Sequence, residues 1–98
     1  MPLVYDLKGK AWLHPGQAAW VFVTLPKGPS TELRDLFGAG RGWGSIPVQV
    51  TIGGTTWRTS VFPDKASGGY VLPLKAAVRK AEGILVGKSV ACRLEFLA

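Results

Sequence analysis

Ninety-eight residues are enough for one domain with a single modest core, and we expect residues 1–98 to form that one domain. One cysteine excludes an internal disulfide framework and a cysteine-cluster metal site, and no apolar run is long enough to span a bilayer. Twelve Lys and Arg residues against six Asp and Glu give a formal net charge of +6, which favours polyanionic partners unless it serves solubility alone.

The first part of the chain predicts two strands and a helix. Residues 3–12 alternate apolar and polar side chains, which is typical of a half-exposed strand, and residues 14–17 read as a turn. Residues 18–25 are denser in apolar groups, so we expect a strand that is covered on both faces or is central in its sheet.

A short helix is predicted over residues 29–37. Pro29 suits its first turn and Ser30 is an alternative cap, while Gly38 ends it. Its apolar stripe is expected to consist of Leu33, Leu36 and Phe37.

The middle of the chain predicts a β-hairpin with a fixed register. Gly53 and Gly54 form a two-residue turn in which both glycines supply the positive φ angles of a primed turn. That turn places Val50 opposite Trp57, and side-chain alternation then gives both strands one apolar and one polar face. We expect the apolar face to belong to the core and the polar face, with Arg58 at its centre, to meet water or a ligand.

The second part of the chain continues with a polar loop over residues 63–69 and a strand over residues 70–74. A second short helix over residues 75–82 is stopped by Gly83, and a last strand covers residues 89–97. The residues of this last strand that are expected to point inward are Val90, Cys92, Leu94 and Phe96.

Two segments repeat the same order of elements: strand, Leu-Pro, short helix, Gly, loop and strand. In this repeat Leu25-Pro26 corresponds to Leu72-Pro73, and Gly38 corresponds to Gly83. Because a piece of this size cannot bury its own apolar face, the two should pack together around a pseudo-two-fold axis. The expected fold is mainly β, a small double-split barrel of about six to seven strands capped by two short α-helices, in which closure removes exposed strand edges.

The strings GWGS, VQVTIGGTTWRTSVFPDK, GGY, LPLKAAVRKAEG and VGKSV follow one another along nearly the whole chain. In order and spacing they resemble the bacterial domain of unknown function 1905 family. The resemblance implies a small β-barrel of the double-split type, found alone or fused to a domain assigned to bacteriocin protection, and it brings no established catalytic or binding residues. The stretch YVLPLKAAVRKAEGILVGKSVACRLEF also resembles swapped-hairpin transcription factors of the AbrB/MazE type, in which two chains build such a barrel.

The candidate ligand-binding residues are mostly basic or aromatic and lie around the hairpin and the loops beside it. They are Arg41, Trp43, Arg58, Ser60, Lys65, Tyr70, Lys75 and Arg79. We expect a pocket floored by Arg58 and rimmed by Lys65 or Lys75, since cationic groups beside an aromatic ring suit phosphate or carboxylate recognition. The alternative is a solvated basic face in which Arg58 pairs with Asp64 or Glu95.

The glycine-rich segment 38–44 carries the first two of these candidates. It either closes over a ligand with Arg41 and Trp43, or it is a plain connection from which Trp43 packs into the core.

No catalytic or metal-binding set is predicted, and we expect no cofactor. His14 is the single histidine and lies in a turn, Cys92 alternates with buried apolar residues, and the six carboxylates are scattered. Residues 83–89 have one residue too few between their glycines for a phosphate-binding P-loop, and they lead into a strand.

The leading functional hypothesis is a non-catalytic binding domain for an anionic partner, either nucleic acid or a small phosphate or carboxylate ligand held near Arg58. A protein- or peptide-interaction module in a bacteriocin- or stress-protection context is the alternative, and a small enzyme using the Arg58 pocket is the third. Because the N-terminus lacks a signal-peptide pattern, we expect a soluble cytoplasmic protein of a bacterium-like cell. We expect a monomer in preference to a dimer.

Overall fold

The computed structural model of the chain describes residues 3–16, 20–38 and 44–96. Within these ranges it contains six strands, two α-helices and a π-helical segment. In chain order they are β1 (Leu3–Leu13), β2 (Val21–Thr24), α1 (Lys27–Leu33), the π-helical segment (Arg34–Gly38), β3 (Ile46–Ile52), β4 (Thr55–Asp64), β5 (Gly69–Pro73), α2 (Ala76–Glu82) and β6 (Ser89–Phe96). Among the described residues, neither α-helix is long and apolar enough to cross a membrane.

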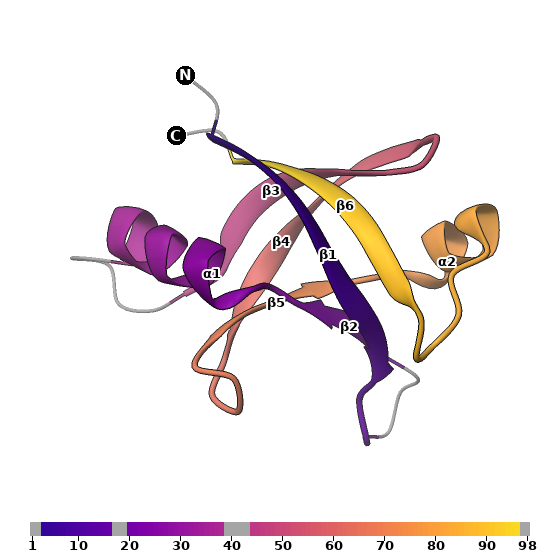
Figure 1. Cartoon of the computed structure of the whole chain (residues 1–98), viewed down its shortest axis with the longest axis horizontal. Helices are drawn as coiled ribbons and strands as arrows, with labels where there is room; N and C mark the ends of the chain where they lie inside the picture. The colour runs from indigo at the N-terminus through magenta and orange to yellow at the C-terminus, as the bar shows by residue number, and fades with distance from the viewer. Residues whose placement is uncertain (1–2, 17–19, 39–43, 97–98) are drawn as a thin grey trace.

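The strands close into one antiparallel barrel in the order β1-β2-β5-β4-β3-β6, with α1 and α2 on opposite sides of it (Figure 1). Two long strands make closure possible, because each changes its partner along its length. β1 pairs with β6 up to Lys10 and with β2 from Ala11 onward. β4 pairs with β3 up to Val61 and with β5 from Phe62 onward. The prediction of a small, mainly β barrel with two short helices is confirmed.

Aliphatic side chains from all six strands fill the barrel, and Tyr70 and Phe96 are the largest side chains that are fully buried. Burial alternates along β6, which confirms the four residues that were predicted to point inward. β2 is buried on both faces, as predicted, because Trp12 and Trp20 pack around Phe22 on its outer side. The strand is shorter than the predicted range of 18–25, and Trp20, which was expected to be covered, is 56% exposed.

The β3–β4 hairpin has the predicted register, with Val50 opposite Trp57. Its turn has a positive φ at Gly53 (57°) but not at Gly54, so the expectation of two positive angles is wrong. A type II′ turn needs a positive φ only at its first central residue. A Cβ at Gly53 would also displace the carboxylate of Glu82 in α2, which accepts a hydrogen bond from Thr55.

Helix α1 begins two residues before its predicted start. Pro26 is the N-cap residue, and Pro29 lies in the first turn, where a missing N–H removes no helical hydrogen bond. Ser30 does not cap the helix. It is buried, and its Oγ accepts a hydrogen bond from the N–H of Tyr70 in β5 at 3.2 Å. This contact ties α1 to the barrel.

The predicted apolar stripe of this helix is right at two positions and wrong at one. Leu33 is buried and Phe37 is half-buried, but Leu36 is 60% exposed. After Leu33 the chain widens into the π-helical segment. A π turn carries more residues than an α turn, so Leu36 rotates away from the face that a regular α-helix would give it.

The two halves of the chain share one order of elements: two strands, a helix and a strand. The barrel order is unchanged when β1, β2 and β3 are exchanged with β4, β5 and β6. The exchange also holds for individual hydrogen bonds. The N–H of Leu25 donates to the carbonyl of Tyr70, and the N–H of Leu74 donates to the carbonyl of Val21, both at 2.9 Å. The predicted internal repeat is therefore present.

The same two bonds show which residues of the two halves are equivalent. They make Leu25 of the first half equivalent to Leu74 of the second. The same displacement along the chain superposes the first and last residues of α1 (27 and 33) on those of α2 (76 and 82). The predicted pairing of Leu25 with Leu72 is therefore wrong by two residues. Leu72 and Leu74 share one face of the chain, so the sequence pattern alone could not choose between them.

Candidate functional site

Three of the predicted site residues line a single pocket of about 330 Å³. The pocket lies where β4 and β5 separate. Residues Phe62 to Asp64 of β4 pair with β5. The earlier residues of β4 pair with β3, and the later residues of β5 pair with β2. The start of α2 covers the gap that results. The lining residues are Trp20, Val21, Trp57, Arg58, Thr59, Pro73, Leu74, Lys75 and Arg79.

Burial separates the floor of this pocket from its rim. Val21 and Leu74 are buried and form an apolar floor. Trp57 is half-buried and forms a wall, while Trp20 is 56% exposed at the rim. Exposing that much of an indole to water is unfavourable, so the rim is well suited to a flat apolar group that would cover it.

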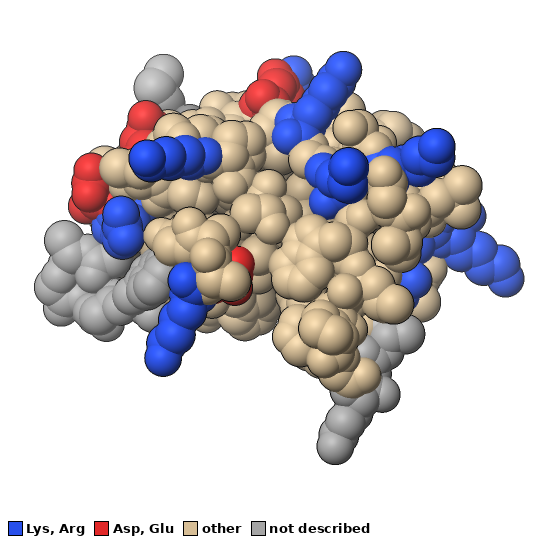
Figure 2. Space-filling model, turned by 60° about the horizontal axis from the view of Figure 1, so that its bottom comes forward, with Lys and Arg blue, Asp and Glu red and all other residues tan. Residues whose placement is uncertain are grey.

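The charged groups of the pocket are all positive. Arg58, Lys75 and Arg79 lie in its lining, and the described lining residues include no carboxylate. The Nε of Arg79 donates to the carbonyl of Leu74 at 3.0 Å, which holds this guanidinium at the start of α2. On the face shown in Figure 2, Lys and Arg side chains stand on both sides of a broad uncharged area. An uncompensated set of cations beside aromatic rings favours an anionic group that carries apolar surface.

The predicted ion pairs of Arg58 are not formed. Neither Asp64 nor Glu95 makes a salt bridge with it, and the salt bridge found in the described part of the chain joins Arg93 to Asp6 at 2.8 Å. Asp64 instead accepts a hydrogen bond from the N–H of Ser67 at 3.2 Å and so shapes the β4–β5 turn. Arg58 is exposed, and its cross-strand neighbour is the uncharged Gln49. Arg58 therefore forms no salt bridge among the described residues, and the nearest carboxylate across the sheet is Glu95, which pairs with Gln49 and lines a small hollow together with Arg58.

The pseudo-two-fold axis provides an internal comparison for this pocket. The equivalents of Trp20 and Arg79 in the other half are Gly69 and Ser30. There the backbone packs directly on the helix: a Cβ on Gly69 would lie 2.8 Å from the Cβ of Ser30. These two residues nevertheless line a hollow of about 380 Å³, which contains no aromatic side chain and no residue of β1. Its lining residues are Leu25, Lys27, Ser30, Thr31, Arg34, Ser67, Gly68 and Gly69. The two equivalent positions therefore border hollows of different chemistry: the hollow beside Trp20 and Arg79 joins aromatic rings with cations, and the hollow beside Gly69 and Ser30 has no aromatic ring in its lining. The fold itself does not require the combination found in the first.

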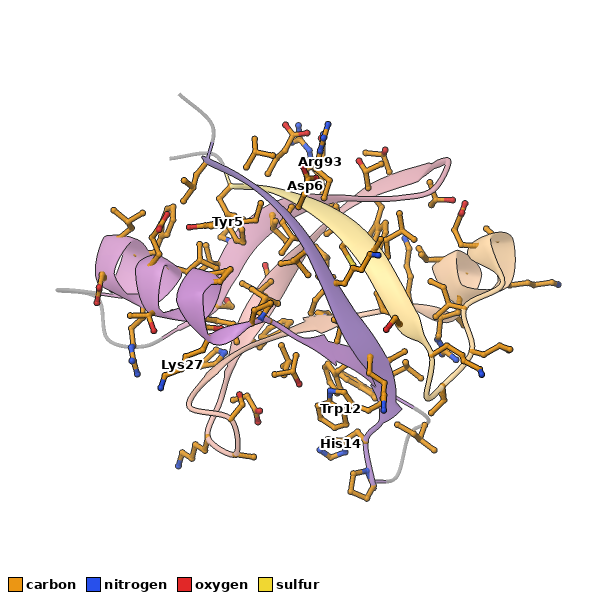
Figure 3. All side chains as sticks on the ribbon, in the orientation of Figure 1. Tyr5, Asp6, Trp12, His14, Lys27 and Arg93 are labelled. Carbon is orange, nitrogen blue, oxygen red and sulfur yellow. The ribbon has the colours of Figure 1, made fainter. Side chains whose placement is uncertain are left out.

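A row of aromatic rings runs from the rim of the pocket across the outer side of β2 and β1. The ring centroid of Trp20 lies 5.9 Å from that of Phe22, which lies 5.3 Å from that of Trp12. Trp12 lies 6.2 Å from His14, and the two residues project together at one end of β1 (Figure 3). The Nε1 of Trp12 donates to Oγ1 of Thr24 at 2.9 Å, which fixes the indole on the sheet.

The other candidate residues lie elsewhere. Ser60 is on the outer face of β4 opposite Pro47, and Lys65 is in the exposed turn between β4 and β5. Tyr70 is fully buried in the core, because β5 is covered on both faces and its alternation points this ring inward. The segment that carries Arg41 and Trp43 lies outside the described residues, so the two hypotheses for it stay predictions.

Three side chains that lie outside the pocket have shifted pKa values. Burial raises the pKa of the Cys92 thiol to about 11. Partial burial, together with its hydrogen bond to Glu32 Oε1 at 2.5 Å, raises the pKa of Tyr5. The hydrogen bond from Arg93 lowers the pKa of Asp6. Among the described residues no group of three His, Cys, Asp or Glu side chains is placed to hold a metal ion.

Sequence reasoning missed the aromatic half of the pocket. Trp57 was expected only as a core residue, and Trp20 only as part of a buried strand. The available signal was the spacing of Trp12 with His14 and of Trp20 with Phe22, since residues two apart in a strand share a face. That Trp20 then meets α2 depends on the pairing of β2 with β5, which no local pattern encodes.

Comparison with known proteins bears on the fold rather than on the pocket. A family described as "Domain of unknown function (DUF1905)" matches residues 8–94, nearly the whole chain, which confirms the resemblance found in the sequence. No curated protein matches the chain.

Proposed function

Since the chain belongs to the DUF1905 family, whose description names no activity, we propose a function from the pocket itself. The protein is a non-catalytic binding domain that takes an anionic ligand in the gap between β4 and β5. Lys75 and Arg79 hold the anionic group, Arg58 adds charge at the edge, and the apolar floor and Trp57 receive the rest of the ligand.

The observation that carries this proposal is the difference between the two equivalent gaps. The hollow beside Gly69 and Ser30 has no aromatic ring in its lining, so this fold does not require aromatic side chains at this position. The other carries Trp20 and Arg79 at the same positions. An exposed indole beside three cations, with no carboxylate in the described lining of the same pocket, suits a ligand that has both an apolar and an anionic part.

The composition of the lining supports binding rather than catalysis. A general base or nucleophile is usually a His, Cys, Asp, Glu, Ser or activated Lys held by a neighbouring group. The described lining residues include no His, Cys or carboxylate, and Thr59 is the single hydroxyl among them. Arginine instead serves as a fixed donor to carboxylate and phosphate oxygens.

The proposal is tested by thermal unfolding in the presence of anions of increasing size: inorganic phosphate, ribose 5-phosphate, benzoate and AMP. A ligand present at ten times its Kd stabilises the folded state by about 1.4 kcal/mol, which raises the Tm of a domain of this size by about 6 to 11 °C. We expect at least one of the organic anions to do so at low salt, with a smaller effect at high salt because screening weakens the attraction.

Two variants and a control assign any binding to the pocket. Lys75→Gln and Arg79→Gln should each weaken it about ten-fold, as loss of a charged hydrogen-bond partner does. Lys27→Gln is the matched control, because Lys27 is an exposed lysine at the start of the other helix (Figure 3). The proposal is wrong if none of the four anions binds, or if binding depends on Lys27 and not on Lys75.

A further inference from the structure

Building on the proposed function, we infer that the ligand of this pocket is a nucleotide unit: a planar base that stacks on Trp20 or Trp57, with its phosphate on Lys75 and Arg79. The inference concerns the class of ligand, whereas the proposal above requires only that the ligand be anionic.

The first argument is the pairing of ring surface with positive charge. Both indoles belong to the lining, one half-buried and one largely exposed, and the cations lie beside them. Every nucleobase has a π face that stacks on an aromatic side chain, and its phosphate is a strong acceptor for guanidinium and ammonium groups. A simple phosphate ion would use the cations and leave the exposed indole of Trp20 in water.

The second argument is size. A pocket of about 330 Å³ is at the lower end of the range of about 300–1,000 Å³ found for small-molecule sites. It accommodates one ring with its sugar phosphate and is too small for a dinucleotide cofactor held within it. Any further nucleotide would therefore lie outside the pocket, on the surface that adjoins it.

The third argument is the nature of that adjoining surface. The exposed rings of Trp20 and His14 and the half-buried ring of Trp12 surround the buried Phe22, with centroids 5.3 to 6.2 Å apart. On the outer face of β1, the exposed Lys10 lies two residues before Trp12 and so points to the same side. Aromatic rings and cations along one path are what single-stranded nucleic acid requires. A single strand is therefore the expected source of the nucleotide unit, with the free nucleotide as the other possible source.

The test compares parts of the ligand by calorimetric titration at low salt: ribose 5-phosphate, adenosine, AMP and a six-nucleotide single strand of oligo(A). We expect AMP to bind more tightly than ribose 5-phosphate and adenosine, because each of these lacks one half of the recognised group. Trp20→Ala should weaken AMP binding by about 5- to 150-fold, the effect of removing one stacking partner, and leave ribose 5-phosphate binding unchanged. Trp20→Phe should keep most of the affinity, because it keeps a ring.

Trp20 is exposed at the end of a strand, so its replacement should leave the fold intact, which thermal unfolding of the variant verifies. Equal affinities for AMP and ribose 5-phosphate, or for AMP and benzoate, would overturn the nucleotide inference while leaving anion binding in place. Binding of none of these compounds would overturn both.

The oligonucleotide distinguishes the two sources. If the source is a single strand, oligo(A) binds more tightly than AMP, and the logarithm of its affinity falls with the logarithm of salt concentration with a slope of about −2 for three phosphate contacts. Affinity equal to that of AMP identifies the free nucleotide as the ligand.

Discussion

Replacing Gly9 with alanine tests the way the barrel closes. Gly9 lies just before the point where β1 leaves β6 and joins β2. A Cβ at this position would lie 2.4 Å from Cγ1 of Val23 and 3.2 Å from the carbonyl oxygen of Thr24. Carbon atoms in contact are normally about 3.5–4.0 Å apart, so the added methyl group overlaps its neighbour by more than about 1 Å.

The cost of the overlap follows from where Val23 is. Its side chain is fully buried and β-branched, so it cannot turn into solvent and has few alternative rotamers. Overpacking of this kind costs about 1–3 kcal/mol, and we expect the upper half of that range for Gly9→Ala. At about 4–8 °C per kcal/mol, a loss of about 2–3 kcal/mol lowers the Tm by about 8 to 24 °C.

Thermal and urea unfolding followed by circular dichroism measure this loss. Gly54→Ala is the matched control, because no atom lies within 4 Å of a Cβ built on Gly54 and its φ is not positive. This control should be as stable as the parent or gain up to about 1 kcal/mol from its less flexible unfolded chain. If Gly9→Ala melts at the same temperature as Gly54→Ala, β1 does not cross onto β2 at this point and the described closure is wrong.

Three further predictions concern contacts outside the pocket. Thr55 Oγ1 donates a hydrogen bond to Glu82 Oε2 at 2.6 Å, which links α2 to the hairpin turn. Thr55→Val and Glu82→Ala should each lower the free energy of unfolding in urea by about 1 kcal/mol, and the double variant should lower it by no more than the larger of the two single losses. Additive losses would show that the bond contributes nothing. Cys92 is buried, and burial raises the pKa of its thiol to about 11, so a thiol reagent at pH 8 should label it only when the chain unfolds. Rapid labelling of the folded protein would contradict the position of Cys92 in the core. The hydrogen bond from Arg93 lowers the pKa of Asp6, so this pair stabilises the fold above the unfolded-state value of about 3.9 and loses that effect as the pH falls through the lower folded-state pKa. Asp6→Asn should therefore be slightly less stable at pH 7 at low salt and equal to the parent at pH 2, and a difference that persists at pH 2 would assign the effect to something other than the ion pair.

The structure also explains how a chain built from two similar halves can carry one site. Two-fold equivalence fixes the backbone, including the paired bonds of Leu25 and Leu74, but it does not fix side chains. Gly69 and Ser30 border a hollow without aromatic rings, and the residues at the same positions in the other half, Trp20 and Arg79, border one that joins aromatic rings with cations. The comparison predicts that introducing a large side chain at Gly69 disturbs the packing of α1, whereas position 20 tolerates small ones.

Local pattern in the sequence determined most of the fold. Alternation of period two located the strands, the Gly53-Gly54 turn set the register of the hairpin, and Gly83 marked the end of α2. The repeated order of elements was enough to predict a closed barrel of two similar halves. These features depend on residues that are neighbours along the chain, and their geometry is set by backbone sterics and by burial of one strand face.

Only the tertiary structure decided which residues meet in the pocket. The cations Arg58, Lys75 and Arg79 were visible in the sequence as a basic cluster, but Trp20 comes from a distant strand and enters the site because β2 pairs with β5. Tyr70 leaves the site for the same kind of reason, since covering both faces of β5 turns its ring into the core. The partners that two strands have elsewhere in the barrel determine where those strands separate and which side chains face each other across the gap. This pairing depends on the whole chain and not on a local segment.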